Sequence, residues 1–281
     1  MSKPPARSNR RAGGRDTGSR TSSGRGGLGG GQVEGRRAVR ELLRARRRTI
    51  RRLVVSTDLD ADPVIDEIVA LAADAQVRIE YISGFELEAL ARTSAPQGVV
   101  AQAVPVDEAD VDAMLAHSRA FVVALDGVTD PGNLGAVIRT AETAGATGLV
   151  LPRHRAAGLS PAAVKAASGA IEYLSIALVA GIPAFLDRAR RAGLWTVGLD
   201  ERGATSVFDL SVGEGPVVLV LGAEGRGMSR LARDRCDVVA AIPMRGALES
   251  LNVSAAAAVA CFEINRRRGS FEPEVGFEPT T

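Results

Sequence analysis

The sequence predicts an α/β protein in which a small α/β domain precedes a larger domain built on a parallel sheet. Apolar runs and amphipathic segments alternate along most of the chain, as they do where helices connect parallel strands. The runs 217–221 and 238–242 are wholly apolar and lack alternation, which predicts strands buried on both faces of the sheet. At 281 residues, the chain is long enough for two hydrophobic cores.

The N-terminal part of the chain predicts an arm followed by a compact domain. Residues 1–32 combine Gly, Ser, Arg and Pro with almost no large apolar side chains, so we expect a disordered basic arm. Residues 33–104 have the size and the alternation of an α/β unit. Within this unit we expect helices over residues 36–48, 63–75 and 84–92 and strands over residues 53–56, 77–82 and 99–104. The acidic residues 105–118 predict a linker or a short lead-in helix.

The second domain is predicted to span residues 119–268. Its first strand, residues 121–125, precedes a helix over residues 134–144 whose apolar stripe excludes Arg139. Asn133 is suited to cap this helix. The same alternation predicts strands over residues 148–151, 176–179 and 194–199 and helices over residues 161–167, 183–192 and 253–268. Residues 269–281 are predicted to form a disordered tail.

Charge is distributed unevenly along the chain. Residues 1–52 contain 16 Lys or Arg and three acidic residues, whereas the remainder contains 19 basic and 30 acidic residues. A basic segment attached to an acidic body favours a polyanionic partner, of which nucleic acid is the first candidate. For residues 1–30 alone, a tail that only improves solubility is an equal alternative.

Several kinds of site and location are disfavoured. His117 and His154 are the only histidines, and Cys236 and Cys261 lack the spacing of zinc ligands, so we expect no metal site and no histidine-dependent triad. We expect the cysteines to be free, and the sequence contains neither an apolar run of membrane-spanning length nor a signal peptide. These observations predict a cytoplasmic protein without a membrane partner. The glycine-rich turn at residues 222–227 lacks the G-x-G-x-x-G spacing of a dinucleotide site.

Three loops with polar side chains follow predicted strands, and their shared edge of the sheet is where parallel sheets bind ligands. The loops are DPGNLGAVIRTA at residues 130–141, LVLGAEGRGM at residues 219–228 and IPMRGALESLNVS at residues 242–254. In this order and at this spacing they resemble the three signature motifs of the SpoU (TrmH-type) RNA ribose 2′-O-methyltransferases, a family of the SPOUT superfamily.

The resemblance implies a fold, an assembly and a substrate. It implies a deep trefoil knot in the second domain and a homodimer formed through the knotted region and the last helix. Residues 33–104 resemble, more weakly, the L30e-like RNA substrate-binding domain of ribosomal RNA methyltransferases, although Pro96 stands where that domain often has His. This extra domain implies a guanosine of bacterial large-subunit (23S) ribosomal RNA, alone or in a pre-ribosomal particle, as the substrate. A tRNA 2′-O-methyltransferase is the nearest alternative, and a non-catalytic ribosome-assembly factor that binds RNA is the alternative outside enzymes.

The resemblance also implies S-adenosylmethionine as the methyl donor, with no metal. The residues that match the family's cofactor-binding positions are Leu221, Gly222, Glu224, Gly227, Ile242, Met244, Ser250, Leu251 and Asn252. We expect glycine at positions such as 222, 225 and 246 because a Cβ would exclude a ligand that approaches the backbone closely.

The catalytic roles that the resemblance implies fall on Arg139, Asn133, Glu224, Ser250 and Asn252. Family accounts propose the arginine as proton acceptor, but a guanidinium stays protonated in proteins. We therefore expect Arg139 to hold a substrate phosphate and orient the hydroxyl. The alternatives are an Arg139–Glu142 pair on the helix surface, a solvated Glu224, and helix capping by Ser250, Asn252 or Ser254.

Six basic residues are candidates for RNA contact: Arg36, Arg37, Arg40, Lys165, Arg226 and Arg245. Lys and Arg bind RNA mainly through its phosphates. Ordinary surface charge is the alternative for each of them.

Overall fold

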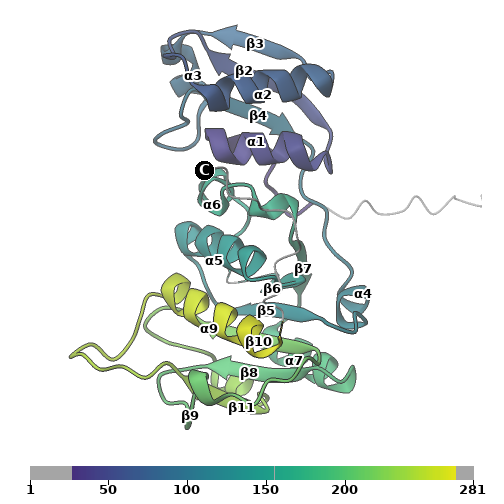
Figure 1. Cartoon of the computed structure of the whole chain (residues 1–281), viewed down its shortest axis with the longest axis vertical. Helices are drawn as coiled ribbons and strands as arrows, with labels where there is room; N and C mark the ends of the chain where they lie inside the picture. The colour runs from purple at the N-terminus through teal and green to yellow at the C-terminus, as the bar shows by residue number, and fades with distance from the viewer. Residues whose placement is uncertain (1–26, 155, 270–281) are drawn as a thin grey trace, which may run out of the picture.

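The computed structural model describes residues 27–154 and 156–269. It contains two sheets, each in its own domain, and the domains are stacked along the long axis of the molecule (Figure 1). Residues 1–26 of the predicted arm and residues 270–281 of the predicted tail lie outside the described residues. The α/β class that the sequence predicts is confirmed for both domains.

The N-terminal domain is a four-stranded sheet with the strand order β1-β4-β2-β3. β4 is antiparallel to β1 and β2, and β3 is parallel to β2. The strands are β1 (Gln32–Glu34), β2 (Ile50–Ser56), β3 (Ile79–Ile82) and β4 (Val99–Ala103). The helices are α1 (Arg36–Ala45) and α2 (Pro63–Asp74), which cover one face of the sheet, and α3 (Gly84–Leu90), which covers the other.

The second domain has a seven-stranded sheet with the order β7-β6-β5-β10-β8-β11-β9, in which neighbouring strands are parallel. The strands are β5 (Phe121–Asp126), β6 (Gly148–Pro152), β7 (Ser175–Val179), β8 (Trp195–Leu199), β9 (Thr205–Ser206), β10 (Val217–Gly222) and β11 (Val238–Ala241). The helices are α4 (Val111–Leu115), α5 (Pro131–Thr143), α6 (Pro161–Ala167), α7 (Ile182–Arg191), α8 (Arg230–Arg233) and α9 (Val253–Arg267), with two short 3₁₀ helices, η1 (Ala170–Glu172) and η2 (Val207–Asp209).

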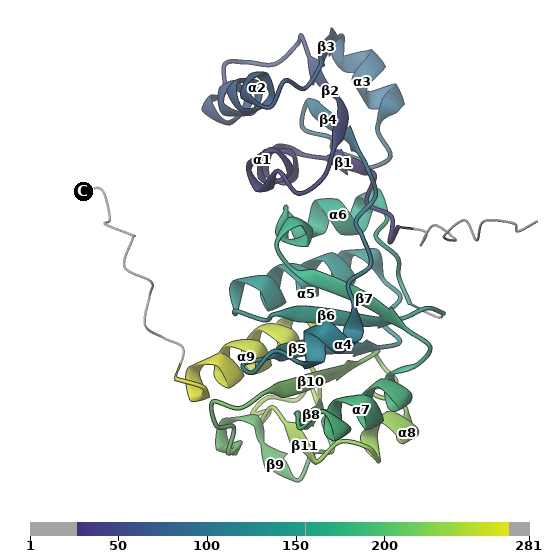
Figure 2. The same cartoon turned by 90° about the vertical axis from the view of Figure 1, so that its right-hand side faces the viewer.

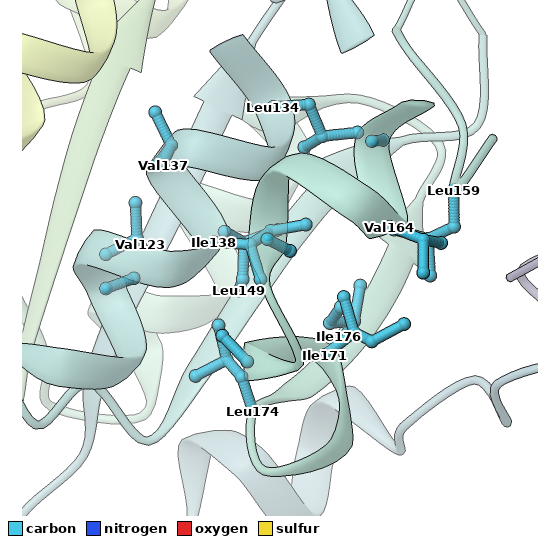
Figure 3. Close-up of a cluster of buried hydrophobic side chains, with 14 of the residues drawn as sticks. Val123, Leu134, Val137, Ile138, Leu149, Leu159, Val164, Ile171, Leu174 and Ile176 are labelled. Carbon is cyan, nitrogen blue, oxygen red and sulfur yellow. The ribbon is translucent and has the colours of Figure 1, made fainter. Parts of the chain in front are cut away.

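Helices cover both faces of this sheet, with α5 and α9 on one side and α4, α7 and α8 on the other (Figure 2). Side chains along β5 point alternately to the two faces of the sheet, so this strand contributes to the hydrophobic core on each face. Val123 and Leu125 pack against the α5 side, whereas Val122 and Ala124 pack against the α7 side. Figure 3 shows the α5 side, where Leu134, Val137 and Ile138 meet apolar residues of β6, α6 and η1. This packing fixes the helix that carries Arg139.

Two predictions about the second domain are wrong. Asn133 does not cap α5. The helix begins at Pro131, before the predicted first residue 134, and its cap is Asp130, which accepts a hydrogen bond from Asn133 N over 2.7 Å. An Asp-Pro pair supplies both the cap and the first helical residue, so the helix begins there. β11 is not buried on both faces: Val238 and Val239, whose side chains point to opposite faces of the sheet, are each only partly buried near the edge of the sheet. β10, in contrast, is fully buried from Val217 to Leu221.

The first domain also differs from its prediction at two boundaries. α1 ends at Ala45 rather than at residue 48, because Arg46 adopts a left-handed conformation with φ 51°. Residues 27–32 of the predicted arm are paired with other segments. Leu28 N donates to Val106 O over 2.8 Å, and Gly30 N donates to Leu159 O over 2.8 Å.

Across residues 27–154 and 156–269, no helix is long and apolar enough to cross a membrane. The trefoil knot stays a prediction.

Candidate active site

A pocket opens where β8, β10 and β11 end, and the second and third motifs form its walls. Its volume is about 420 Å³, within the usual range for small-molecule sites. The apolar part of the lining consists of Leu199, Leu221, Ala223, Ile242, Met244, Leu251, Val253 and Ala256. The polar part includes Asp200, Glu224, Arg233, Ser250 and Asn252. The pocket therefore brings together all nine residues predicted to bind the cofactor.

The second motif is a tight hairpin that follows β10. Ala223 N donates to Gly227 O over 3.1 Å, and Gly227 N donates to Ala223 O over 2.8 Å. A Cβ on Gly222 would lie 2.1 Å from Gly227 C and from Met228 N, so this position accepts only glycine. Gly227 has φ +65°, which also favours glycine. These two glycines are required by the hairpin itself.

At Gly222 that geometry gives a reason for glycine other than room for a ligand. At Gly222 the space for a Cβ is already filled by backbone of the same loop. At Gly246 a Cβ would have no atom within 4 Å of it, and the backbone is not in the left-handed region. Gly225 has equally open surroundings but a positive φ of 73°, so it is needed for the turn.

Asn252 joins the three motifs through its side chain. Its Nδ2 donates to Asn133 Oδ1 over 3.0 Å and to Glu224 Oε1 over 2.5 Å. Its Oδ1 accepts hydrogen bonds from Ser254 N over 2.8 Å and from Ser254 Oγ over 2.6 Å, which caps α9. The capping alternative is therefore confirmed for Asn252, and the same amide also connects the site.

Arg139 lies on the exposed surface of α5. Within the described part of the chain it forms no ion pair, so the alternative pair with Glu142 is absent. Glu142 has a different neighbourhood: burial, and then the nearby Glu41 carboxylate, raise the pKa of its carboxyl. The guanidinium of Arg139 is thus available to an anionic ligand.

Sequence reasoning missed the Asp200–Arg233 ion pair in the pocket. Asp200 directly follows β8, and its side chain is only 4% exposed. It pairs with Arg233 of α8 and accepts a hydrogen bond from Arg202 N over 3.0 Å. A carboxylate at the carboxyl end of a parallel strand was the available signal, since the other pocket loops begin at the same edge.

The six candidate RNA contacts fall into two groups. Arg37, Arg226 and Arg245 are exposed and form no ion pair within the described residues. The other three side chains form contacts with other residues of the protein. Arg36 pairs with Asp62, Arg40 pairs with Glu41 over 3.0 Å, and Lys165 donates to Ala95 O of the N-terminal domain.

The lining of the pocket agrees with an organic cofactor, and neither Cys236 nor Cys261 belongs to it. Burial, the largest cause for both thiols, raises the pKa of Cys236 and of Cys261 to about 12. No group of three or more His, Cys, Asp or Glu residues suited to a metal ion occurs in residues 27–154 and 156–269. A cleft lined by both apolar side chains and polar ones such as Glu224 and Ser250 fits S-adenosylmethionine, whose adenine and methionine carbons need burial and whose polar ends need hydrogen bonds.

Comparisons with known proteins identify the family. Residues 120–262 match the SpoU rRNA Methylase family, and residues 32–109 match the RNA 2′-O ribose methyltransferase substrate-binding family. The chain is 36% identical, over 85% of its length and 96% of the relative's, to the 23S rRNA (guanosine-2′-O-)-methyltransferase RlmB of Pseudomonas syringae pv. tomato. It is 38% identical, over 85% of its length and 77% of the relative's, to an uncharacterized tRNA/rRNA methyltransferase of Mycolicibacterium vanbaalenii.

A solved structure supports the same assignment. The chain is similar to the SpoU methyltransferase AviRb from Streptomyces viridochromogenes in complex with the cofactor AdoMet, with a TM-score of 0.70 and 28% identity. That similarity covers 85% of this chain and 90% of AviRb. The chain belongs to the SpoU rRNA methylase family and is an S-adenosylmethionine-dependent RNA ribose 2′-O-methyltransferase.

Proposed function

We propose that this chain methylates the ribose 2′-hydroxyl of a guanosine in large-subunit (23S) ribosomal RNA, within naked RNA or a pre-ribosomal particle. Relatives named for that reaction match it over almost their whole length, as the 96% coverage of the Pseudomonas syringae protein shows. The match of residues 32–109 to an RNA substrate-binding family supports a large, structured RNA as the partner.

The observation that carries the proposal is the set of hydrogen bonds around Asn252. They connect Asn133 of the first motif with Glu224 of the second, at the mouth of the cofactor pocket. A protein that only binds RNA has no need of such a polar cluster beside an apolar pocket. The arrangement therefore favours catalysis over the non-catalytic assembly factor.

Arg139 is proposed to bind the substrate phosphate and orient the ribose hydroxyl. An arginine side chain suits a bidentate phosphate contact better than proton abstraction. It is exposed and without an ion pair among the described residues, so binding RNA does not require an existing pair to break. Orientation matters because methyl transfer needs the oxygen in line with the methyl group and its leaving sulfur.

The cofactor would be held by the pocket residues named above, Glu224 and Ser250 among them. When bound, S-adenosylmethionine supplies an electrophilic methyl group on a sulfonium. The chain's own contribution is to exclude water from the apolar part of the pocket and to fix the polar groups at its mouth. Asn252, held from three sides, keeps Glu224 and Asn133 at a set separation.

The protein is further proposed to act as a homodimer. Large apolar side chains are exposed on the third motif and on α9: Leu248 at 80%, Leu251 at 43% and Phe262 at 41%. Large exposed apolar side chains are typical of an interface, and a second copy of the chain would cover them. Light scattering should give the mass of two chains. Phe262→Glu is expected to shift it toward one chain, whereas Phe85→Glu in the N-terminal domain, 84% exposed in the native chain, should not.

The substrate is tested by incubating the protein with methyl-labelled S-adenosylmethionine and total RNA, followed by mapping of 2′-O-methylated positions. Label at one guanosine of large-subunit ribosomal RNA supports the proposal, and Arg139→Ala provides the inactive control. Label confined to tRNA overturns the substrate. Cofactor binding without transfer to unmodified or partly assembled ribosomal RNA would instead favour the assembly factor.

A further inference from the structure

Arg48, at the end of the turn after α1, has its side chain buried between the two domains, with 6% exposed. Its partner is Glu172 of η1 in the second domain, whose side chain is 1% exposed. The pair is bidentate: Arg48 Nε donates to Glu172 Oε2 over 2.9 Å, and Arg48 Nη2 donates to Glu172 Oε1. Planar, bidentate pairs of this kind fix geometry as well as charge.

The third guanidinium nitrogen of Arg48, Nη1, forms hydrogen bonds with the two segments of chain that pass between the domains. Arg48 Nη1 donates to Gly30 O and to Val104 O, each over 2.9 Å. Gly30 lies just before β1, and Val104 directly follows β4. One guanidinium therefore connects the N-terminal domain, both crossing segments and η1. Figure 1 shows α1 and α6 facing each other where the two domains meet.

Other contacts in the same interface are close-fitting. Arg47 Nη1 donates to Glu172 O over 2.8 Å, and Tyr173 Oη donates to Glu41 Oε2 over 2.9 Å. Gly169 has φ +98°, and a Cβ there would lie 2.3 Å from Glu41 Cβ, so α1 is packed directly against the backbone before η1. Such a fit is expected of a docked domain rather than of one on a free tether.

We propose that Arg48 is a positioning residue for methyl transfer: its buried pair with Glu172 holds the RNA-binding domain at a fixed place relative to the pocket. The inference rests on the proposed function, because it assumes that one RNA contacts both domains. Removing either partner would leave the other charge buried and unpaired in the docked arrangement, which is strongly unfavourable, so a substitution at Arg48 or Glu172 should release the domain. With the domains docked, an RNA held by one is already aligned with the other and binds at a high effective concentration.

The test compares the full-length protein with Arg48→Ala and Glu172→Gln. Small-angle X-ray scattering should show a larger radius of gyration for both variants, because the N-terminal domain is released. The KM for ribosomal RNA should rise about tenfold, as expected when a second contact loses its effective concentration, while kcat and the Kd for S-adenosylmethionine change little. Arg46→Ala is the matched control, since among the described residues Arg46 pairs with Asp74 of its own domain alone and both side chains are exposed. It should leave scattering and KM unchanged.

The outcomes separate this proposal from the function on which it rests. Unchanged scattering and KM in Arg48→Ala would overturn it, and so would an equal loss in kcat. If the wild-type protein transfers no methyl group to ribosomal RNA, the proposed function fails, but scattering still tests the docking. If circular dichroism shows that Arg48→Ala does not fold, Gly169→Val disrupts the same interface from the other domain, and the same readouts apply to it.

Discussion

Asn252 Nδ2 lies 2.5 Å from Glu224 Oε1, so an amide at the start of α9 donates a hydrogen bond to a carboxylate in the hairpin after β10. The opposite side of the same amide, Oδ1, accepts from Ser254 N and caps α9. One side chain thus serves the site with its donor and the helix with its acceptor. The two roles can be separated by a substitution that changes only the donor.

Asn252→Asp removes the donor and retains the acceptor. A carboxylate caps a helix as well as an amide does, so the free energy of unfolding should change little. Next to Glu224, however, it places a second negative charge where a hydrogen bond was, and it leaves Asn133 Oδ1 without its donor. We expect the kcat for methyl transfer to fall about 100-fold, as for loss of one preorganised polar contact.

Radiolabelled methyl transfer and urea unfolding, measured on the same preparation of Asn252→Asp, give both quantities. Ser254→Ala is the control for the cap, because it removes only the hydroxyl that also bonds to Asn252 Oδ1. Retained activity in Asn252→Asp would mean that the contacts with Glu224 and Asn133 do not contribute to the reaction.

Arg139→Ala is expected to abolish methyl transfer while leaving the Kd for S-adenosylmethionine nearly unchanged. Arg139 is absent from the lining of the cofactor pocket and lies on exposed α5, so its removal should affect RNA and not the cofactor. Isothermal titration with S-adenosylmethionine and a single-turnover methylation assay measure the two effects. A collapse of cofactor affinity would assign Arg139 to the pocket and contradict the phosphate role. Arg139→Lys should retain part of the activity, because it keeps the charge but loses the bidentate geometry.

Elements with strong local signals were predictable from the sequence, and the contacts that fix the site were not. α6 spans residues 161–167 as predicted, because Ser160 and Pro161 mark its beginning. The cap of α5 was assigned to Asn133 although Asp130-Pro131 carried the stronger local signal. Burial of β11 depended on what lies outside it in the sheet, which a single apolar run does not contain.

Long-range pairs explain the remaining difference. Arg48 and Glu172 are separated by 124 positions, and Asp200 and Arg233 by 33, so no local pattern links them. The three motifs, in contrast, lie together as the sequence predicts. Each motif follows a strand of one parallel sheet, and these strands end at one edge of the sheet. The order of the strands therefore predicts where the pocket lies. Its hydrogen bonds depend on the positions of individual side chains, which the order of the strands does not determine.

Gly222→Ala and Gly246→Ala are expected to differ, although both glycines were predicted to make room for the cofactor. At Gly222 the new Cβ would meet Gly227 C and Met228 N at 2.1 Å, so the hairpin must distort and stability should fall by about 2 kcal/mol, as for overpacking. At Gly246 nothing lies within 4 Å, so the free energy of unfolding should stay the same. Thermal unfolding without ligand checks this difference, and equal effects of the two substitutions would contradict it.

Glu263 near the end of α9 should make stability depend on pH in the acid range. Its hydrogen bonds with Arg266, opposed by burial and reinforced by Arg267, lower the pKa of its carboxyl from 4.5 to about 2. Because the folded-state pKa lies below the unfolded value, the ionised carboxylate stabilises the protein above pH 4.5, and this contribution is lost as the pH falls toward 2. Arg267 also donates to Leu210 O over 2.6 Å, so the cluster anchors the helix that begins at the site.

Glu263→Gln should therefore cost about 2 kcal/mol of stability at pH 7, and the difference from the wild-type chain should shrink by more than half at pH 3. Urea unfolding at pH 7, 5 and 3 measures it. Glu88→Gln on exposed α3 makes the same chemical change where the described residues provide no ion partner, so it should show no difference at any of these pH values. A difference for Glu263→Gln that stays constant from pH 7 to pH 3 would mean that the packing of this side chain, and not its charge, provides the stabilisation.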